Sequence, residues 1–226
     1  MDNNDIKKVI QILKKEVNKW KTPIVGRIEE QTKDPYRVLI SCILSLRTKD
    51  ATTEKASMKL FALADNPYQM VKKSPLQIRK AIYPVGFYNR KAFTIKEISK
   101  ILIEKYNGVV PDTLDELLQL PGVGRKTANL VVTVAYKKQG ICVDTHVHRI
   151  VNRWGYVKTK NPMETEMALR KKLPSQYWLT FNDLLVTYGQ NLCKPVSPKC
   201  NECRISKFCD FYKNKKGLSY EKTNNN

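Results

Sequence analysis

Hydrophobic residues recur at helical spacing along most of the chain. Near the start, intervals of three and four residues separate Ile6, Val9, Ile10, Leu13, Val17 and Trp20. This spacing predicts an amphipathic surface helix over residues 5–20, ended by the Thr22-Pro23 break. The segment YRVLISCILSL, after Asp34-Pro35, is apolar on nearly every face, which predicts a central, buried helix capped by Asp34.

Helical patterns continue as far as the C-terminal region. Caps and breaks are expected at Asp50, Asn66-Pro67, Ser74-Pro75 and Pro111-Asp112. Periodic helices are expected over residues 90–106, 125–137, 162–173 and 175–189, with short ones in TLDELLQL and after Asp144 or Thr145. The chain shows no tandem repeat and no convincing pair of strands, so the sequence predicts an all-α protein.

An excess of positive charge narrows the range of possible binding partners. The 226 residues include 41 Lys and Arg against 21 Asp and Glu, which gives a net charge of +20. Because such a charge opposes folding by self-repulsion, a polyanionic partner explains it most simply, and nucleic acid is favoured over a membrane surface. A basic protein without such a partner is the alternative. No apolar run has membrane-spanning length and the N-terminus does not resemble a secretory signal, so we expect an intracellular protein with reduced cysteines.

The segment LPGVGRKTAN, residues 120–129, carries the first candidate chemistry. Gly122 and Gly124 would let the backbone approach a DNA phosphate closely, and the helix start that follows attracts anions. An ordinary turn between two helices is the alternative. Arg125 is expected to contact a phosphate. Lys126 would lie in the first helical turn, where the helix dipole lowers the pKa of the amine and so favours its neutral, nucleophilic form.

Such an amine needs a carboxylate that accepts and returns protons or stabilises a cationic intermediate. Asp144 in VDTHVHRI is the candidate. Asp144 also stands at the expected start of a helix. An aspartate cap contributes about 1 kcal/mol and needs no catalytic reason to exist. On the local sequence alone, the cap is the favoured reading of Asp144.

Four of the six cysteines lie close together in CKPVSPKCNECRISKFC, at positions Cys193, Cys200, Cys203 and Cys209. Four thiolates at short spacing indicate a metal site, and both zinc and iron–sulfur clusters accept tetrahedral thiolate ligands. The gaps of six, two and five residues match neither the ferredoxin spacing nor paired zinc knuckles. The same loop carries Lys199, Arg204 and Lys207, whose side chains are expected to reach DNA phosphates.

Taken in order, LPGVGRKTAN, VDTHVHRI and the four cysteines resemble the endonuclease III family of DNA glycosylases with AP lyase activity. The resemblance implies the helix-hairpin-helix glycosylase fold and a [4Fe-4S] cluster on the four cysteines. It also implies that Lys126 attacks C1′ of a damaged nucleotide in double-stranded DNA and that Asp144 supports the reaction. The implied reaction removes an oxidised pyrimidine through a Schiff base and cleaves the strand on the 3′ side by β-elimination.

Two positions depart from the family pattern. Phe87 in PVGFYNRKA stands where the family more often has a leucine that wedges into the duplex, and Arg47 in LSLRTKD stands where a glutamine more often fills the vacated space. We expect both to contact DNA, and we hypothesise that Arg47 reads an unpaired guanine. A core aromatic beside Tyr88 is the alternative for Phe87.

The expected architecture has two helical domains with a DNA-binding groove between them. Residues 24–138 form one, with the helix-hairpin-helix motif at 120–137, and residues 1–23 with 139–226 form the cluster-bearing one. A monomer associated with the DNA of the nucleoid is expected. The alternatives are a mismatch glycosylase, which removes adenine, or thymine or uracil opposite guanine, and a non-catalytic iron–sulfur DNA-binding module. Lys126 argues against the mismatch glycosylase, and Lys126 together with Asp144 argues against the binding module.

Overall fold

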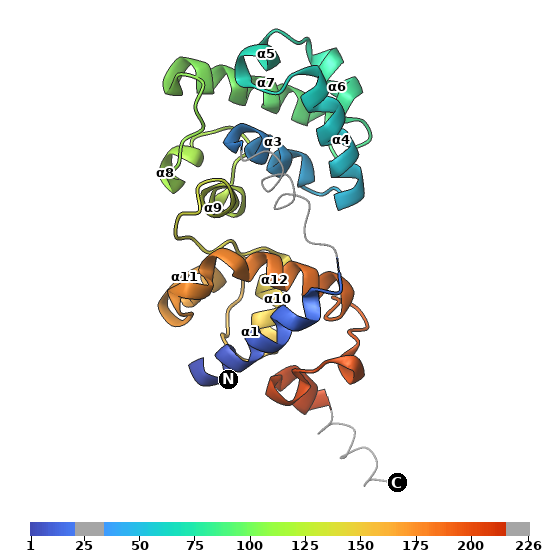
Figure 1. The fold of residues 1–226 in the computed structure, drawn as a ribbon, viewed down its shortest axis with the longest axis vertical. Helices are drawn as coiled ribbons and strands as arrows, with labels where there is room; N and C mark the ends of the chain where they lie inside the picture. Colours follow the sequence, from blue (N-terminus) through green and yellow to red (C-terminus); the bar gives the residue numbers. More distant parts are fainter. Residues whose placement is uncertain (21–33, 216–226) are drawn as a thin grey trace. The chain divides into compact units, whose positions relative to one another are not determined.

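The computed structural model describes residues 1–20 and 34–215, and every regular element in this part of the chain is helical, as the sequence predicted (Figure 1). The chain divides into two compact units. One joins Met1–Thr22 to Val143–Asn226, and the other is Pro23–Cys142. The division therefore follows Cys142, whereas the predicted boundary followed Lys138, and the boundary predicted after residue 23 lies outside the described residues.

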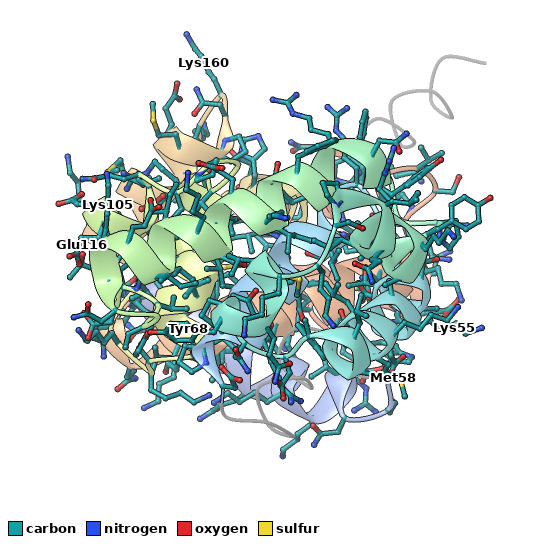
Figure 2. All side chains as sticks on the ribbon, turned by 90° about the horizontal axis from the view of Figure 1, so that it is seen from above. Lys55, Met58, Tyr68, Lys105, Glu116 and Lys160 are labelled. Carbon is teal, nitrogen blue, oxygen red and sulfur yellow. The ribbon has the colours of Figure 1, made fainter. Side chains whose placement is uncertain are left out.

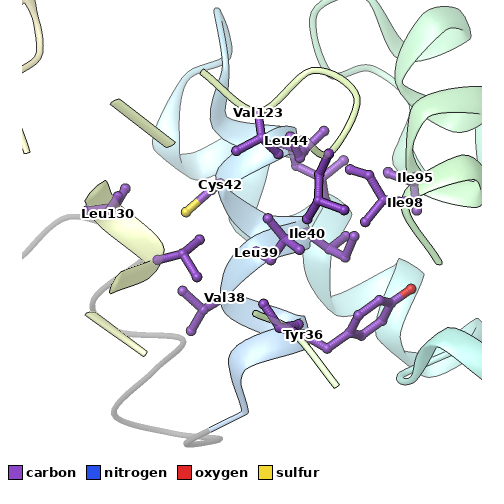
Figure 3. Close-up of a cluster of buried hydrophobic side chains, with 14 of the residues drawn as sticks. Tyr36, Val38, Leu39, Ile40, Cys42, Leu44, Ile95, Ile98, Val123 and Leu130 are labelled. Atoms are coloured by element: carbon purple, nitrogen blue, oxygen red, sulfur yellow. The ribbon is translucent and has the colours of Figure 1, made fainter. Parts of the chain in front are cut away.

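The unit Pro23–Cys142 is built around α3 (Pro35–Ser45). Asp34 caps this helix as predicted, because its Oδ1 accepts a hydrogen bond from Tyr36 N at 2.9 Å. The helix contacts α4 (Asp50–Leu63), α7 (Tyr88–Tyr106) and α9 (Arg125–Val134), and its side chains are buried over almost its whole length. Figure 3 shows the resulting cluster, in which α3 supplies most of the labelled side chains.

Short helices complete this unit, and their starts follow local sequence. Asn66 caps α5 (Pro67–Val71) and Ser74 caps α6 (Pro75–Ile82), as predicted. The prediction of a cap at Asp50 is wrong, because Asp50 is the first residue of α4 and Lys49 occupies the cap position without a side-chain hydrogen bond. The helix expected in TLDELLQL is only α8 (Leu114–Leu117), and it starts from Thr113 because the Thr113 hydroxyl accepts from Glu116 N.

The other unit contains α1 (Asn3–Val17), α10 (Thr145–Arg153), α11 (Pro162–Lys172) and α12 (Trp178–Asn191), with three 3-10 turns at Ser175–Tyr177, Cys200–Glu202 and Ser206–Phe208. Helix α12 contacts both α1 and α10, and α11 contacts α10. The apolar face predicted for the N-terminal helix is buried at Ile6, Val9, Ile10 and Leu13. In the described part of the chain, no helix is both long and apolar enough to cross a membrane.

Candidate active site and cysteine loop

The glycine turn predicted to bind phosphate joins α8 to α9. Leu120 and Val123 anchor it, since both side chains are buried, and Figure 3 shows Val123 beside Leu44 of α3. Gly122 and Gly124 are exposed. The turn therefore has an apolar side that packs into the core and a glycine side that faces outward.

The reasons for a glycine at position 122 and at position 124 are different. Gly122 has a φ of +75°, a conformation that side-chain-bearing residues rarely adopt. Gly124 has an ordinary φ of −96°, and a Cβ atom at Gly124 would meet nothing within 4 Å. Neither backbone strain nor packing inside the protein explains a glycine at position 124. Gly124 is the N-cap of α9, a position at which glycine is favoured, and the open space around it also lets a ligand approach the backbone closely.

Lys126 is the second residue of α9, directly after Arg125, and Gly124 gives this helix no side-chain cap. The Lys126 side chain is half-buried, whereas the next residue, Thr127, is buried. The Lys126 carbonyl accepts a hydrogen bond from the Cys142 thiol at 3.4 Å, which ties the first turn of α9 to the end of the unit. The amine is thus attached to a rigid helical turn beside the outward-facing glycines.

Asp144 lies in the other unit and caps α10. Its Oδ1 accepts a hydrogen bond from Val147 N at 2.9 Å, so the prediction of a cap is confirmed. The side chain is half-buried. A carboxylate has two oxygens with several lone pairs, and this cap uses one oxygen. The cap is therefore compatible with a second role, and the catalytic role of Asp144 stays a prediction.

Arg47 and Phe87 lie side by side in the unit Pro23–Cys142. The guanidinium carbon of Arg47 is 5.6 Å from the centre of the Phe87 ring. The Phe87 side chain is 59% exposed, so the alternative of a core aromatic is wrong. Both residues line a hollow of about 570 Å³ that also reaches Gly122 of the glycine turn. Three residues predicted to bind DNA from separate parts of the sequence thus surround one concave surface.

The four cysteines predicted to hold a cluster line one cavity. The Tyr188 hydroxyl and Cys203 Sγ share a hydrogen bond at 3.0 Å, and burial raises the pKa of Tyr188. Arg153 donates to Cys193 Sγ at 3.4 Å. Burial raises the pKa of Cys203, and it raises the pKa of Cys209 to about 11. Several buried thiolates repel one another, so this cavity favours a positively charged group that neutralises them.

The donor set of this cavity is four cysteine thiols, which suits a metal centre bound by thiolates. Among the described residues, no three Cys, His, Asp or Glu side chains are grouped closely enough to hold a single ion. A zinc ion requires all four sulfurs at about 2.3 Å from one point. A four-iron cluster gives each thiolate its own iron atom and accepts a wider ring of sulfurs. Four cysteines around one cavity are the donor set that either kind of centre requires.

The basic side chains of the cysteine loop have partners within the protein. Lys199 Nζ is 3.4 Å from Glu202 Oε2, and Arg204 Nε is 3.8 Å from Glu16 Oε2. The Lys207 ammonium lies 5.3 Å from the centre of the Phe208 ring. The three basic side chains are themselves exposed, and such surface contacts are weak in water, so Lys199, Arg204 and Lys207 stay accessible to an anionic partner.

Sequence reasoning missed the residues that hold the cysteine loop in place. Arg149 donates to the Cys193 carbonyl at 2.9 Å, and Arg153 donates to the carbonyls of Lys194 and Pro195 at 2.7 and 2.8 Å. The two arginines are four residues apart on α10, so they share one helix face. That spacing was the available signal, because a helix that begins at Asp144 presents both side chains in the same direction.

The sequence of the chain is similar to those of known proteins. Residues 40–175 match the profile of the HhH-GPD superfamily of base excision DNA repair proteins, which covers more than half of the chain. The chain is 53% identical over 180 residues to Endonuclease III of Thermotoga maritima, and the match covers 80% of this chain and 84% of that protein.

The chain belongs to the HhH-GPD superfamily and, within it, to the endonuclease III family. Its function is that of a base excision repair DNA glycosylase with AP lyase activity.

Solved structures with a similar fold support this family assignment. One, described as a non-covalent Endonuclease III-DNA complex, has a TM-score of 0.85 and 31% identity, and the match covers 95% of this chain and 98% of that chain. A thermostable thymine-DNA glycosylase has a TM-score of 0.83 and 28% identity, with 94% and 98% covered. The fold is therefore shared by an endonuclease III and a thymine-DNA glycosylase, so the fold by itself does not determine which base is removed.

Proposed function

We propose that this chain excises oxidised pyrimidines from duplex DNA with Lys126 as the nucleophile and then cleaves the strand on the 3′ side of the abasic site. The observation that carries the proposal is the position of Lys126. It is a half-buried amine in the first turn of α9, two residues after an exposed glycine that no internal packing requires. A backbone that approaches a phosphate at Gly124 brings the sugar of the same nucleotide chain within reach of a side chain in that turn.

The lysine chemistry accounts for both activities. The Lys126 amine forms a bond to C1′ while the bond from C1′ to the base breaks, and the electron pair leaves with the base. Opening of the sugar, with a proton passing from nitrogen to O4′, leaves an imine between Lys126 and C1′. The imine acidifies the C2′ hydrogen, and loss of that proton expels the 3′ phosphate and cleaves the strand. Water then hydrolyses the imine and frees the amine.

We propose Asp144 as the carboxylate that supports this reaction. A nearby negative charge stabilises the cationic character that develops at C1′, and a carboxylate accepts the proton that the attacking amine must lose. The cap at Val147 N holds the carboxyl group in one orientation. A carboxylate that is fixed before the substrate arrives needs little reorganisation during the reaction.

The proposed partner is double-stranded DNA with a damaged base or an abasic site, bound by a monomer that is associated with the DNA of the nucleoid. The net charge of +20 supports a polyanionic partner. Arg125, Gly122 and Gly124 are the proposed phosphate contacts of the hairpin. The proposed contacts of the cysteine loop are Lys199, Arg204 and Lys207, all partly or fully exposed.

We also propose that the four cysteines hold one [4Fe-4S] cluster. When bound, the cluster serves as a structural crosslink that neutralises the four thiolates. The chain's own contribution is the carbonyl contacts from Arg149 and Arg153, which fix the loop that carries Lys199.

Borohydride trapping tests the proposal, because the reagent reduces the imine to a stable covalent bond. Wild type is incubated with duplex DNA containing thymine glycol, and we expect base release and a trapped adduct. Lys126→Gln should form no adduct. The matched control is Lys105→Gln, which changes an exposed lysine in the last turn of α7 (Figure 2) and should trap like wild type.

Each contrary result has a specific meaning. Trapping by Lys126→Gln at the wild-type level would show that another group is the nucleophile. Wild type that binds DNA without base release or trapping would support the binding-module alternative. Faster removal of thymine from a T/G mismatch than of thymine glycol would support the mismatch glycosylase, which the similarity to a thymine-DNA glycosylase makes the second candidate.

A further inference from the structure

In the unit Pro23–Cys142, Arg47 and Phe87 are two of the non-glycine residues that lie in the left-handed region of backbone space. Arg47, after α3, has a φ of +52°, and Phe87, before α7, has a φ of +58°. A residue with a side chain pays about 1–2 kcal/mol for this conformation. Such strain persists where the surrounding structure imposes it. The contacts that impose it at Arg47 and Phe87 converge on one side chain, that of Lys91.

Lys91 lies in the first turn of α7 and is only 7% exposed. Its ammonium group donates to the carbonyls of Leu44 and Leu46 at 2.8 and 2.7 Å and to the Thr48 hydroxyl at 3.2 Å. All three protons of the ammonium therefore have an oxygen acceptor. Two of these acceptors belong to the residues on either side of Arg47, so Lys91 fixes the loop that carries it.

The same network reaches the loop of Phe87. Thr48 Oγ1 accepts a hydrogen bond from Gly86 N at 3.0 Å, and Lys91 N donates to the Phe87 carbonyl at 3.0 Å. The two loops are in direct backbone contact, because a Cβ atom at Gly86 would lie 2.5 Å from the Arg47 carbonyl oxygen. Lys91 and Thr48 thus connect the backbone next to Arg47 with the backbone next to Phe87.

Burying the Lys91 ammonium costs free energy, so a contribution to stability does not explain why position 91 has a lysine. Among the described residues, no carboxylate forms an ion pair with Lys91, and its acceptors are neutral oxygens. A buried charge loses several kcal/mol of hydration, and an apolar side chain of similar size often stabilises a protein more. A buried, unpaired lysine therefore indicates a requirement for a particular geometry, which here is that of the two loops.

We propose that Lys91 is a positioning residue that locks the Arg47 and Phe87 loops together, so that both side chains enter damaged duplex DNA as one preformed wedge. The inference rests on the proposed function and specifies how the chain opens its substrate. The cation–π pair, with the Arg47 guanidinium carbon 5.6 Å from the centre of the Phe87 ring, is exposed at the edge of the 570 Å³ hollow. A preformed wedge avoids the entropy cost of ordering two loops during binding.

The experiment separates duplex opening from chemistry. The probe for opening is a duplex with a tetrahydrofuran abasic analogue and 2-aminopurine beside it, whose fluorescence rises when the base unstacks. The probe for chemistry is borohydride trapping on a single-stranded abasic oligonucleotide, which needs no wedge. The variants are Lys91→Met, with Lys105→Met on the same helix as control, and Thr48→Val, with Thr48→Ser as the conservative control that keeps the hydroxyl.

We expect Lys91→Met and Thr48→Val to slow the fluorescence rise by about 10- to 100-fold, because a displacement of about 1 Å has effects of that size. Both should trap single-stranded abasic DNA at the wild-type rate, and Lys105→Met and Thr48→Ser should match wild type in both assays. If Lys91→Met fails to fold, the two Thr48 variants decide the question alone.

Three results would overturn the inference: wild-type opening by Lys91→Met, equal opening by Thr48→Val and Thr48→Ser, or a parallel loss of opening and single-strand trapping in a folded variant. Absence of trapping by wild type itself would instead count against the proposed function.

Discussion

Asp144 stands both as a helix cap and as the proposed catalytic carboxylate, and two substitutions separate these roles. Asparagine keeps a side-chain oxygen that can accept from Val147 N, where Asp144 Oδ1 now accepts at 2.9 Å. Alanine removes the acceptor. Asp144→Asn therefore retains the cap without the charge, and Asp144→Ala loses both. The two variants should differ in stability and agree in activity.

The expected losses of stability and activity follow from what each variant removes, the cap acceptor or the negative charge of Asp144. Loss of an N-cap acceptor costs about 1 kcal/mol, within a range of about 0.5–2. Loss of the negative charge at the start of α10 costs about 0.3–1 kcal/mol in both variants. For a chain of this size, about 1 kcal/mol lowers Tm by about 2–4 °C. We expect Asp144→Ala to melt about 2–4 °C below Asp144→Asn. Loss of the carboxylate should slow base release by about 10²- to 10⁴-fold in both.

The assay is single-turnover base release from thymine-glycol duplex, with thermal unfolding measured on the same samples. Asn161→Ala is the matched control, because Asn161 caps α11 in the same unit through a bond of 2.9 Å from Glu164 N. This control should lose comparable stability and keep its activity. A wild-type rate for Asp144→Asn would refute the catalytic role. Equal losses of activity in Asn161→Ala and Asp144→Ala would mean that the rate follows helix stability.

Further predictions concern the glycine turn and Lys91. Gly124→Ala should weaken DNA binding and cost only about 0.5–1 kcal/mol of stability, because alanine is a poorer N-cap than glycine but its Cβ would meet no atom within 4 Å. Gly122→Ala should lower Tm further because of the φ of +75° at Gly122. Unchanged DNA affinity in Gly124→Ala, measured by fluorescence anisotropy, would argue against close approach of a phosphate there. Burial lowers the pKa of Lys91 to about 8, so between about pH 8 and 10.5 the folded state binds the proton more weakly than the unfolded state does. Wild type should therefore gain on the order of 1–2 kcal/mol over Lys91→Met between pH 7.5 and 9.5 in urea unfolding, and a constant difference would contradict the lowered pKa.

Much of the fold was predictable because its signals are local. The caps at Asp34, Asn66, Ser74 and Asp144 each act on a backbone amide two or three residues later, so a short sequence contains both partners. The apolar run of α3 likewise predicts its own burial. The error at Asp50 has a local cause too, since aspartate is favoured both at the cap and in the first helical turn.

The motifs of the candidate site were also visible in the sequence. The glycine turn, the lysine that follows it and the four spaced cysteines are short patterns whose chemistry depends on residue type and order. What they left open was the role of each residue. Asp144 and Phe87 each had two possible roles, and the core role of Phe87 was excluded only when its side chain proved to be exposed and next to Arg47.

The sequence by itself thus determined the helices, the hairpin that carries Lys126 and the cysteines of the loop, because each depends on neighbours within a few residues. Tertiary structure alone decided that Arg47 and Phe87 form a cation–π pair, that Lys91 joins their loops, and that Arg149 and Arg153 hold the cysteine loop. The partners in these contacts are far apart in the chain. Their pairing depends on how the helices pack, and no local pattern of residues specifies it.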